Sequence, residues 1–477
     1  MKTITNSSPR IFAQLRETGA FVLIIVGLVD VTVAADRPNI LFMMSDDQAW
    51  NGLSVAMHSD LDWSKSSIVE TPNLEKLAAQ SMRFSAAYAP ASVCSPTRIS
   101  LQTGKSPATM HWTKAAPPEA GRKMIEPRNT KQIARSEVTV AELLHDAGYA
   151  TAHYGKWHLN GGGPAAHGYD EGDGENGNEY AHKFVNPNPA DIFGMTERAI
   201  SFIERSNKAG KPFFIQMSWH ALHASQNAMP ATLAKYAQKM GGRADDKRVS
   251  SAAIAENLDT GVGLVVDAVD RLGLQDNTFV IYMSDNGSGG GGRGRSGGLA
   301  GGKGGVWEGG IRSPFIIRGP GIQPGSWCHE RIVGYELFPT YCEWAGISTA
   351  KLPRNIEGGS IVALLDDGQG TVKRQREEMV FHFPHYQGGD GPHSALYLGD
   401  LKLMKFYENG RLVLFDMGKN VSERNDLAKR MPDQVAQLDA LLVKYLNDVD
   451  AQMAVPNPNY DPSREQAVSR KGARGRK

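Results

Sequence analysis

Four short, mostly apolar runs constrain the fold of this chain more than any other feature. They are residues 40–44, 149–154, 213–217 and 279–283. Runs of this length are typical of strands that are buried on both faces, as in the middle of a parallel sheet. Helical patterns separate them, and several of these begin with Thr or with Pro in the first turn. The alternation predicts an α/β fold with a large central, mostly parallel sheet flanked by helices.

The pattern changes after residue 375. Short, partly alternating runs follow, with Glu408-Asn409-Gly410 as a tight turn, and then a helical pattern over about residues 432–449. We therefore expect a smaller C-terminal antiparallel sheet packed with a helix. The predicted organisation is a catalytic domain over 36–375, a C-terminal subdomain over 376–460 and a disordered basic tail over 461–477.

The first 35 residues are typical of an export signal. Basic residues precede an apolar run over residues 20–29, and small residues precede Asp36. Cleavage near Ala35 predicts a periplasmic or secreted protein without stable membrane insertion. An uncleaved membrane anchor is the alternative, and it also places the remaining chain outside the cytoplasm.

Charge and cysteine content limit the kind of partner and the kind of fold that we expect. A formal net charge of +1 over 477 residues argues against nucleic acid as a partner. Three cysteines are too few for a disulfide scaffold. Cys328 and Cys342 are able to pair, but nothing in the sequence requires that disulfide.

Oxygen-bearing side chains follow two of the predicted strands. Adjacent acids are more often a helix cap or a solvated turn, but a second oxygen pair at the end of another buried strand favours a shared site. Oxygen ligands without an accompanying His or Cys favour Ca²⁺ or Mg²⁺ over zinc. The predicted metal ligands are Asp46, Asp47, Asp285 and Asn286.

The segment from Cys94 to Gly104 contains the most specific motif. A lone cysteine is usually a small buried residue, but here Cys94-x-Pro96-x-Arg98 is followed by Leu-x-Thr-Gly104. This pattern resembles the signature of the formylglycine-dependent sulfatases of the alkaline phosphatase superfamily, especially bacterial arylsulfatases and polysaccharide sulfatases. The resemblance implies that a maturation enzyme oxidises Cys94 to formylglycine, the catalytic aldehyde, which also ligates the metal.

The same resemblance implies roles for further residues. Arg98 matches the arginine that steadies the formylglycine. Gly155-Lys156-Trp157-His158 matches a family stretch whose lysine binds sulfate and whose histidine contacts the formylglycine. His223 matches a histidine expected to protonate the leaving group, although Leu222 stands where the family often has Pro and His220 lies nearby as an alternative.

A glycine-rich stretch over residues 287–305 has the composition of a linker. Because the strands on either side belong to one site, we interpret it as a mobile active-site loop. Its Lys303 matches the family lysine that binds sulfate near the leaving oxygen.

Together these features predict an exported sulfatase that hydrolyses a sulfate ester of a sugar or polysaccharide. His182, His382 and His385 are candidate substrate-binding residues, although each is as readily an ordinary surface or packing residue. A formylglycine-dependent phosphodiester or phosphonate monoester hydrolase is an alternative. A second alternative is an inactive carbohydrate-binding homologue that keeps Cys94 unmodified.

Overall fold

The computed structural model describes residues 37–175, 177, 181, 186–223, 227–289, 298–387 and 389–463. The predicted signal, His182 and most of the basic tail lie outside the described residues. The chain from Arg37 onward clusters into one compact unit, Arg37–Lys477.

An eight-stranded sheet forms the centre of this unit, in the order β10-β2-β9-β8-β1-β7-β5-β6. Four neighbouring strands are parallel: β8 (Thr278–Ser284), β1 (Asn39–Ser45), β7 (Phe213–Ser218) and β5 (Ala150–Gly155). β9 (Phe315–Arg318) is antiparallel to β8 and to β2 (Met82–Phe84). The short edge strands are β10 (Trp327–Cys328) and β6 (Glu171–Gly172). The sheet confirms the predicted α/β class.

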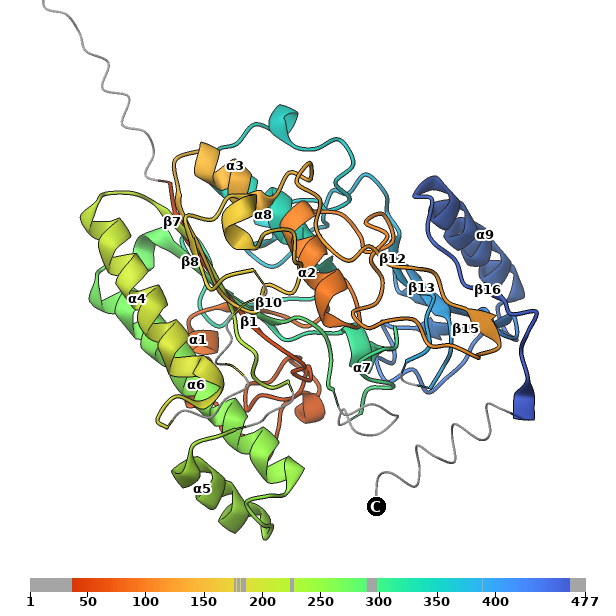
Figure 1. Ribbon diagram of the computed structural model, residues 1–477, viewed down its shortest axis with the longest axis horizontal. Coiled ribbons are helices and arrows are strands. Elements are labelled where there is room, and N and C mark those ends of the chain that lie inside the picture. Colours follow the sequence, from red (N-terminus) through yellow and green to blue (C-terminus); the bar gives the residue numbers. More distant parts are fainter. Residues whose placement is uncertain are drawn as a thin grey trace, which may run out of the picture. The chain divides into compact units, whose positions relative to one another are not determined.

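Helices cover both faces of the central sheet, as Figure 1 shows. Leu41 and Met43 of β1 pack in a core with α1 (Pro72–Ala79), α4 (Ile192–Lys208) and α6 (Lys247–Arg271). Ile40, Phe42 and Met44 pack on the other face with α2 (Cys94–Thr103), α3 (Val140–Asp146) and α8 (Leu337–Trp344). Alternate residues of β1 thus enter two cores, which explains why its sequence is apolar without interruption.

The predicted C-terminal antiparallel sheet is also present. It runs β12 (Met379–Phe383), β13 (His393–Leu398), β14 (Leu401–Phe406) and β15 (Arg411–Asp416). One face packs against α9 (Pro432–Asp448), and the other packs against residues of α7 (Glu308–Ile311) and its flanks. This smaller sheet therefore adjoins the segment that follows Lys303.

The remaining elements are short. Two ladders pair β3 (Ala87–Tyr88) with β11 (Ile332–Val333), and β4 (Met124–Ile125) with β16 (Val455–Pro456). Helix α5 (Pro230–Met240) packs on α6. Among the described residues, the 3₁₀ turns are Asp62–Ser64, Pro164–His167, Pro189–Asp191, Gln275–Asn277, Gly334–Glu336, Thr349–Lys351 and Val362–Leu364. None of the described helices has both the length and the apolar character that a membrane crossing needs.

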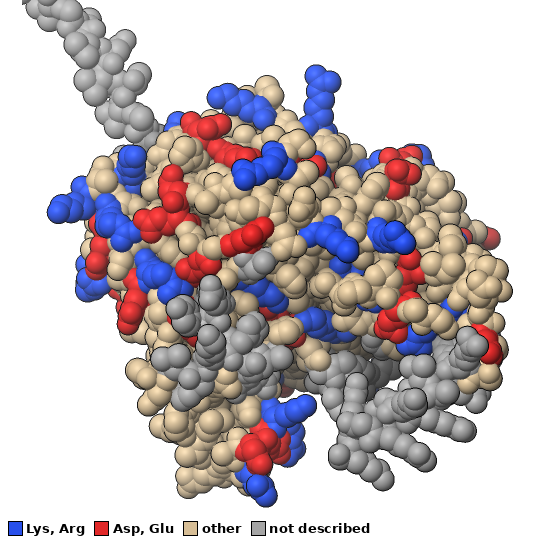
Figure 2. Space-filling model, in the orientation of Figure 1, with Lys and Arg blue, Asp and Glu red and all other residues tan. Residues whose placement is uncertain are grey.

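The surface carries mixed charge. In Figure 2, lysine and arginine side chains alternate with aspartate and glutamate over the visible face, without a large area of one sign. All three cysteines are buried and free, so the disulfide that Cys328 and Cys342 were able to form is not made.

A buried ionic network joins α7 to the second sheet. The Lys402 ammonium lies 3.1 Å from the Glu308 carboxylate and 2.7 Å from that of Glu423. Arg312 donates to Glu308 over 2.6 Å, and Tyr397 also donates to Glu308. Burial raises the pKa of Glu423 to about 7 although Lys402 opposes this rise. Lys402 therefore compensates two carboxylates that water cannot reach.

Replacing Lys402 with methionine should destabilise the protein. A buried carboxylate that loses its partner is costly, and we expect Lys402→Met to lower the free energy of unfolding by about 3 kcal/mol in a urea titration. Lys419→Met is the matched control, because Lys419 forms an exposed pair with Asp416 at 2.8 Å and such pairs contribute at most about 1 kcal/mol. Equal losses in the two variants would contradict the assigned role of Lys402.

Candidate active site

The carboxyl ends of β1 and β8 place two pairs of polar side chains beside each other. Ser45 and Ser284 are paired in the parallel register, so the residues that follow them are neighbours. The Asp285 amide donates to the Ser45 carbonyl over 3.0 Å, and the Asp47 amide donates to the Asp285 carboxylate over 3.2 Å. Asp47 has a φ of 62°, which turns the chain directly after the strand. The predicted metal ligands therefore lie together at one edge of the sheet.

Cys94 is the first residue of α2 and faces this edge. Its side chain is 2% exposed, and its Sγ lies 3.5 Å from the Asp46 carboxylate and 3.3 Å from the Lys303 ammonium. The motif residues shape the helix around it. Pro96 sits in the first turn, where a missing N–H costs nothing, and Gly104 ends the helix with a φ of 69° that favours glycine. The signature thus encodes a short buried helix with Cys94 at its N-terminus.

Three cations surround the carboxylates. Arg98, one turn along α2, donates to Asp285 over 2.7 Å and lies 3.6 Å from Asp46. The Lys156 ammonium contacts Asp46, and the Lys303 ammonium lies 2.5 Å from Asp47. Three positive charges therefore balance three carboxylates in a volume that is almost closed to water.

Burial and these charges set the protonation of the site. Burial alone raises the pKa of Asp46, but Lys156 and Arg98 outweigh it and hold that pKa below its usual range. Burial and the adjacent Asp46 raise the pKa of Asp47 to about 7. Burial and Asp46 also raise the pKa of the Cys94 thiol to about 12. Cys94 is therefore a protonated thiol at neutral pH and a weak nucleophile as encoded.

The side chains fit a hard divalent cation. One carboxylate oxygen from each of Asp46, Asp47 and Asp285 lies within 4.8 Å of the others and of the Cys94 sulfur. The Asn286 amide donates to Asp47 over 2.7 Å and to the Gly287 carbonyl over 2.8 Å. Its Oδ1 is buried and has no hydrogen-bond partner among the described residues. An oxygen-rich set with an unused buried amide oxygen suits Ca²⁺ or Mg²⁺.

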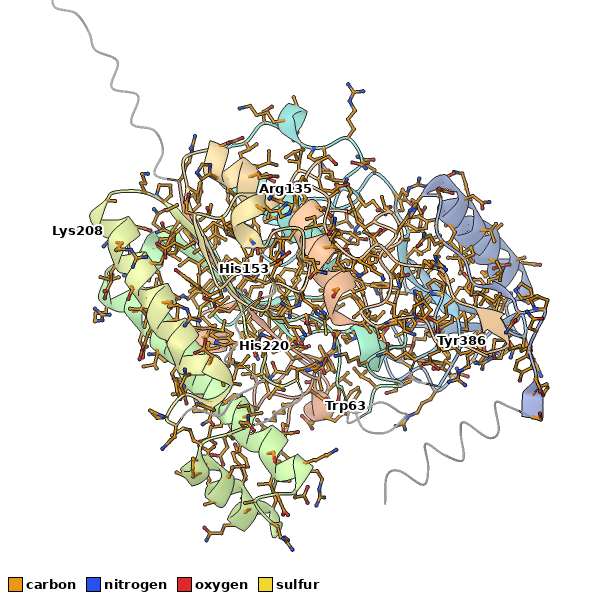
Figure 3. All side chains as sticks on the ribbon, in the orientation of Figure 1. Trp63, Arg135, His153, Lys208, His220 and Tyr386 are labelled. Atoms are coloured by element: carbon orange, nitrogen blue, oxygen red, sulfur yellow. The ribbon has the colours of Figure 1, made fainter. Side chains whose placement is uncertain are left out.

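His223 joins the cluster, and His158 lies near enough for the charges of Lys156 and Arg98 to act on it. His223 places a ring nitrogen within 4.8 Å of the Asp46 and Cys94 ligand atoms. It reaches them because the segment after β7 pairs with the Asp46 segment, with Leu222 donating to the Asp46 carbonyl over 2.7 Å. Burial and Lys156 lower the pKa of His158 to about 3, and burial lowers that of His223 to about 4, although Asp46 raises it. Both imidazoles are neutral in this arrangement. His220, labelled in Figure 3, is itself buried.

The structure does not bring the C-terminal histidines to this cluster. His385 is fully buried, with its ring nitrogens 2.8 Å from Glu126 and 2.7 Å from Thr113. The ring nitrogens of His382 contact Ser394 and the Gln452 carbonyl. With both ring nitrogens engaged, neither residue offers a free polar group to a substrate, and packing accounts for both. His182 lies outside the described residues.

Sequence patterns did not reveal what holds Lys303 in place. The Lys303 amide donates to the Ser288 carbonyl over 3.0 Å, and the Gly304 amide donates to the Ser92 carbonyl over 2.9 Å. A Cβ on Gly304 would lie 2.4 Å from Cγ of Gln387, which shows how closely the β12–β13 connection covers this turn. These contacts join distant segments through backbone groups and one amide side chain, so no local sequence motif predicts them.

Comparison with known proteins relates most of the chain to sulfatases. The family model described as Sulfatase matches residues 38–347, and the one described as N-sulphoglucosamine sulphohydrolase, C-terminal, matches residues 302–452. Arylsulfatase A from Bos taurus is 30% identical, over 73% of this chain and 71% of that protein. An ulvan-active sulfatase from Formosa agariphila is 27% identical, over 87% of this chain and 82% of that protein.

A solved structure is similar in fold. Ps i-CgsB in complex with k-i-k-neocarrahexaose superposes with a TM-score of 0.71 at 21% identity, over 92% of this chain and 98% of that one. The similarity extends across both sheets rather than over the central sheet alone.

The geometry predicts stabilisation by a divalent cation. After EDTA treatment, adding Ca²⁺ at about a hundred times its dissociation constant should raise the unfolding temperature by about 3 °C. Asp47→Asn should remove most of this rise, because it deletes one of the carboxylate ligands that a hard divalent cation prefers. Asp267→Asn, at an exposed pair with Lys76, should keep it. Equal responses of the two variants would argue against a cation at Asp47.

Proposed function

This chain belongs to the sulfatase family. We propose that it is exported and releases sulfate from sulfated sugars or polysaccharides. The reaction would use a calcium ion and a formylglycine that is made from Cys94. The family makes the chain a sulfuric ester hydrolase. The cofactors, the location and the role of each residue are the further content of the proposal. The observation that carries it is the buried contact of Cys94 with Asp46 and Lys303, at the N-terminus of α2.

The charge balance around Cys94 supports a divalent cation and an anionic substrate together. With all three carboxylates ionised and no cation bound, the carboxylates and the three basic side chains sum to zero. A cation held by Asp46, Asp47, Asp285 and Asn286 would leave a surplus of two positive charges. A sulfate ester brings one negative charge, and a deprotonated hydroxyl at residue 94 would bring a second. When bound, the cation would act as a Lewis acid that lowers the pKa of that hydroxyl.

Modification of Cys94 agrees with its surroundings. The pKa of the thiol lies at about 12, so the unmodified residue has little thiolate for attack at neutral pH. Oxidation by a maturation enzyme would supply an aldehyde whose hydrate has two hydroxyls on one carbon, one for attack on sulfur and one for release of sulfate.

Lys156, Lys303 and Arg98 would bind the sulfate oxygens. Burial by itself would lower the pKa of each of these three side chains. Neighbouring acidic groups more than offset this effect, so all three pKa values are raised. The leading group is Asp46 for Lys156, Asp285 for Arg98, and Cys94 for Lys303. The three side chains stay charged at neutral pH and are already oriented by their carboxylate partners. Cations fixed before the reaction stabilise developing charge without reorganisation.

The histidines would move protons. His158, neutral because burial lowers its pKa to about 3, can accept a proton from residue 94 as sulfate departs. His223 would protonate the leaving oxygen, and an anionic sulfate ester beside it would raise its pKa, as Asp46 already does. Lys303, which is charged, would assist by neutralising the same oxygen.

The substrate class is proposed from the relatives and from the N-terminal sequence. One relative is named as ulvan-active, and one solved relative holds a neocarrahexaose. A periplasmic or secreted location would bring the enzyme to such polymers, and residues 1–35 have the pattern of an export signal.

Replacing Cys94 tests the proposed nucleophile. Protein made together with a formylglycine-generating enzyme should release sulfate from an aryl sulfate, and Cys94→Ala should lose this activity while keeping its unfolding temperature. Cys342→Ala, at another buried free thiol, should stay active. The mass of the tryptic peptide over residues 84–98 reports conversion. An active enzyme with an unmodified thiol at 94 would refute the mechanism, and faster turnover of an aryl phosphate would favour the phosphoester alternative.

Substitution of the two histidines after β7 tests the proposed acid. His223→Asn should lower kcat on an aryl sulfate by about 100-fold, the usual contribution of a general acid. His220→Asn should lower it much less, since only His223 groups with Asp46 and Cys94. A larger loss in the His220 variant, at equal unfolding temperature, would reverse the assignment.

A further inference from the structure

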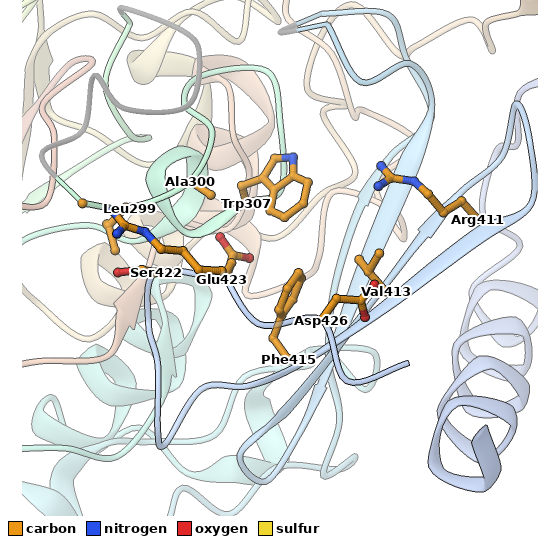
Figure 4. A pocket seen from close by; sticks show the side chains of 11 residues that line it. Leu299, Ala300, Trp307, Arg411, Val413, Phe415, Ser422, Glu423 and Asp426 are labelled. Carbon is orange, nitrogen blue, oxygen red and sulfur yellow. The ribbon is translucent and has the colours of Figure 1, made fainter. Parts of the chain in front are cut away.

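A cavity of about 470 Å³ lies between the segment that leads to Lys303 and the second sheet. None of the residues assigned to the reaction lines it. Its floor is buried and mostly apolar, with Leu299, Trp307, Val413 and Phe415 all less than 5% exposed. Its rim is exposed and charged. Figure 4 shows Trp307 and Phe415 between Arg411 on one side and Ser422 and Glu423 on the other. We name it the Arg411 cavity.

Two arginines on the rim have unused hydrogen-bond donors. The Arg411 guanidinium rests on the Phe406 ring, 3.8 Å from its centroid. Within the described residues, neither this guanidinium nor that of Arg424 has a hydrogen bond or an ion pair. Arginine offers five N–H donors in a planar fork that matches carboxylate and sulfate groups.

The acidic groups of the cavity are already engaged. Glu423 is buried, 2.7 Å from the Lys402 ammonium, and accepts the Glu308 amide over 2.9 Å. Asp426, on the rim, accepts the Leu414 amide over 3.1 Å and the Ala428 amide over 2.9 Å. Lys402 balances the charge of Glu423. Of the charged side chains that line the cavity, this leaves one negative charge, on Asp426, and two positive charges, on the arginines. The cavity therefore has a positive surplus that favours an anion.

Aromatic rings make the floor suitable for a sugar. The Trp307 ring centroid lies 6.0 Å from that of Phe406 and 5.9 Å from that of Phe415. Trp307 donates its ring N–H to Asp390 over 2.7 Å, which fixes the orientation of the indole. The small exposed parts of Trp307 and Phe415, beneath polar donors, suit the C–H face and the charged substituents of a pyranose, and the volume lies within the range of ligand pockets.

We propose that the Arg411 cavity binds an anionic sugar residue, bearing sulfate or carboxylate, of the polymer whose sulfate ester is hydrolysed at Cys94. This inference rests on the proposed function. The cavity and the active site share one stretch of chain: Leu299 and Ala300 line the cavity, Lys303 follows three residues later, and Trp307 returns to the cavity wall. An occupant of the cavity would therefore contact the stretch of chain that carries Lys303.

Direct binding tests the proposal on the full chain carrying Cys94→Ala, which leaves polymers intact. The probes are dextran sulfate, polygalacturonate and neutral dextran. Adding Arg411→Gln and Arg424→Gln should weaken the Kd for dextran sulfate at least about tenfold, because two charge-assisted contacts are lost. The matched control, Lys351→Gln with Arg354→Gln, removes two exposed charges that do not line the cavity and should change the Kd less than about twofold. Unfolding temperatures verify the fold of each variant.

Each result bears on the cavity. An arginine-dependent loss for polygalacturonate as well would show that charge, rather than sulfate, is recognised, and it supports the proposal. Equal losses in the two double variants, no loss in either, or tight binding of neutral dextran would overturn it. The aryl sulfate assay tests the proposed function separately. A protein that releases no sulfate but keeps arginine-dependent binding would contradict the proposed function and still support binding at the Arg411 cavity.

Discussion

Compensation of buried charge is the constraint on which the rest of this structure depends. The parallel register of β1 and β8 places Asp46, Asp47 and Asp285 together at a position that water hardly reaches. Carboxylates in such a place require cations or protons. Arg98 comes from α2, Lys156 from the end of β5 and Lys303 from the stretch before α7. The need for charge balance thus ties three separate elements to one edge of the sheet.

A second balanced cluster repeats this principle at the junction with the C-terminal sheet. Lys402 of β14 holds Glu308, the first residue of α7, together with Glu423. Lys303 lies five residues before Glu308, so the cluster that anchors α7 also limits where Lys303 can lie. The two sheets are therefore coupled through this short stretch of chain. The Arg411 cavity lies at the same junction, and its occupant would touch the segment on which Lys303 depends.

The sequence predicted the architecture well, for identifiable reasons. Strands buried on both faces are apolar without interruption, and β1 and β8 were recognisable by this alone. The motif around Cys94 forms a buried helix in the structure, and Pro96 and Gly104 satisfy backbone requirements of its two ends. For His385 the sequence left packing and substrate contact equally open, since a histidine in an aromatic segment looks the same in both cases, and the structure places its ring beside the buried Glu126.

By itself, then, the sequence determined the class of fold and the family, because these depend on local pattern and on residue type. Tertiary structure decided which groups meet. It placed His223 beside Asp46 and Cys94, kept His382 and His385 elsewhere, and gave the Asn286 Oδ1 no partner among the described residues. Such choices depend on strand register and on the closing of long loops, in which residues hundreds of positions apart become neighbours, and no local pattern encodes them.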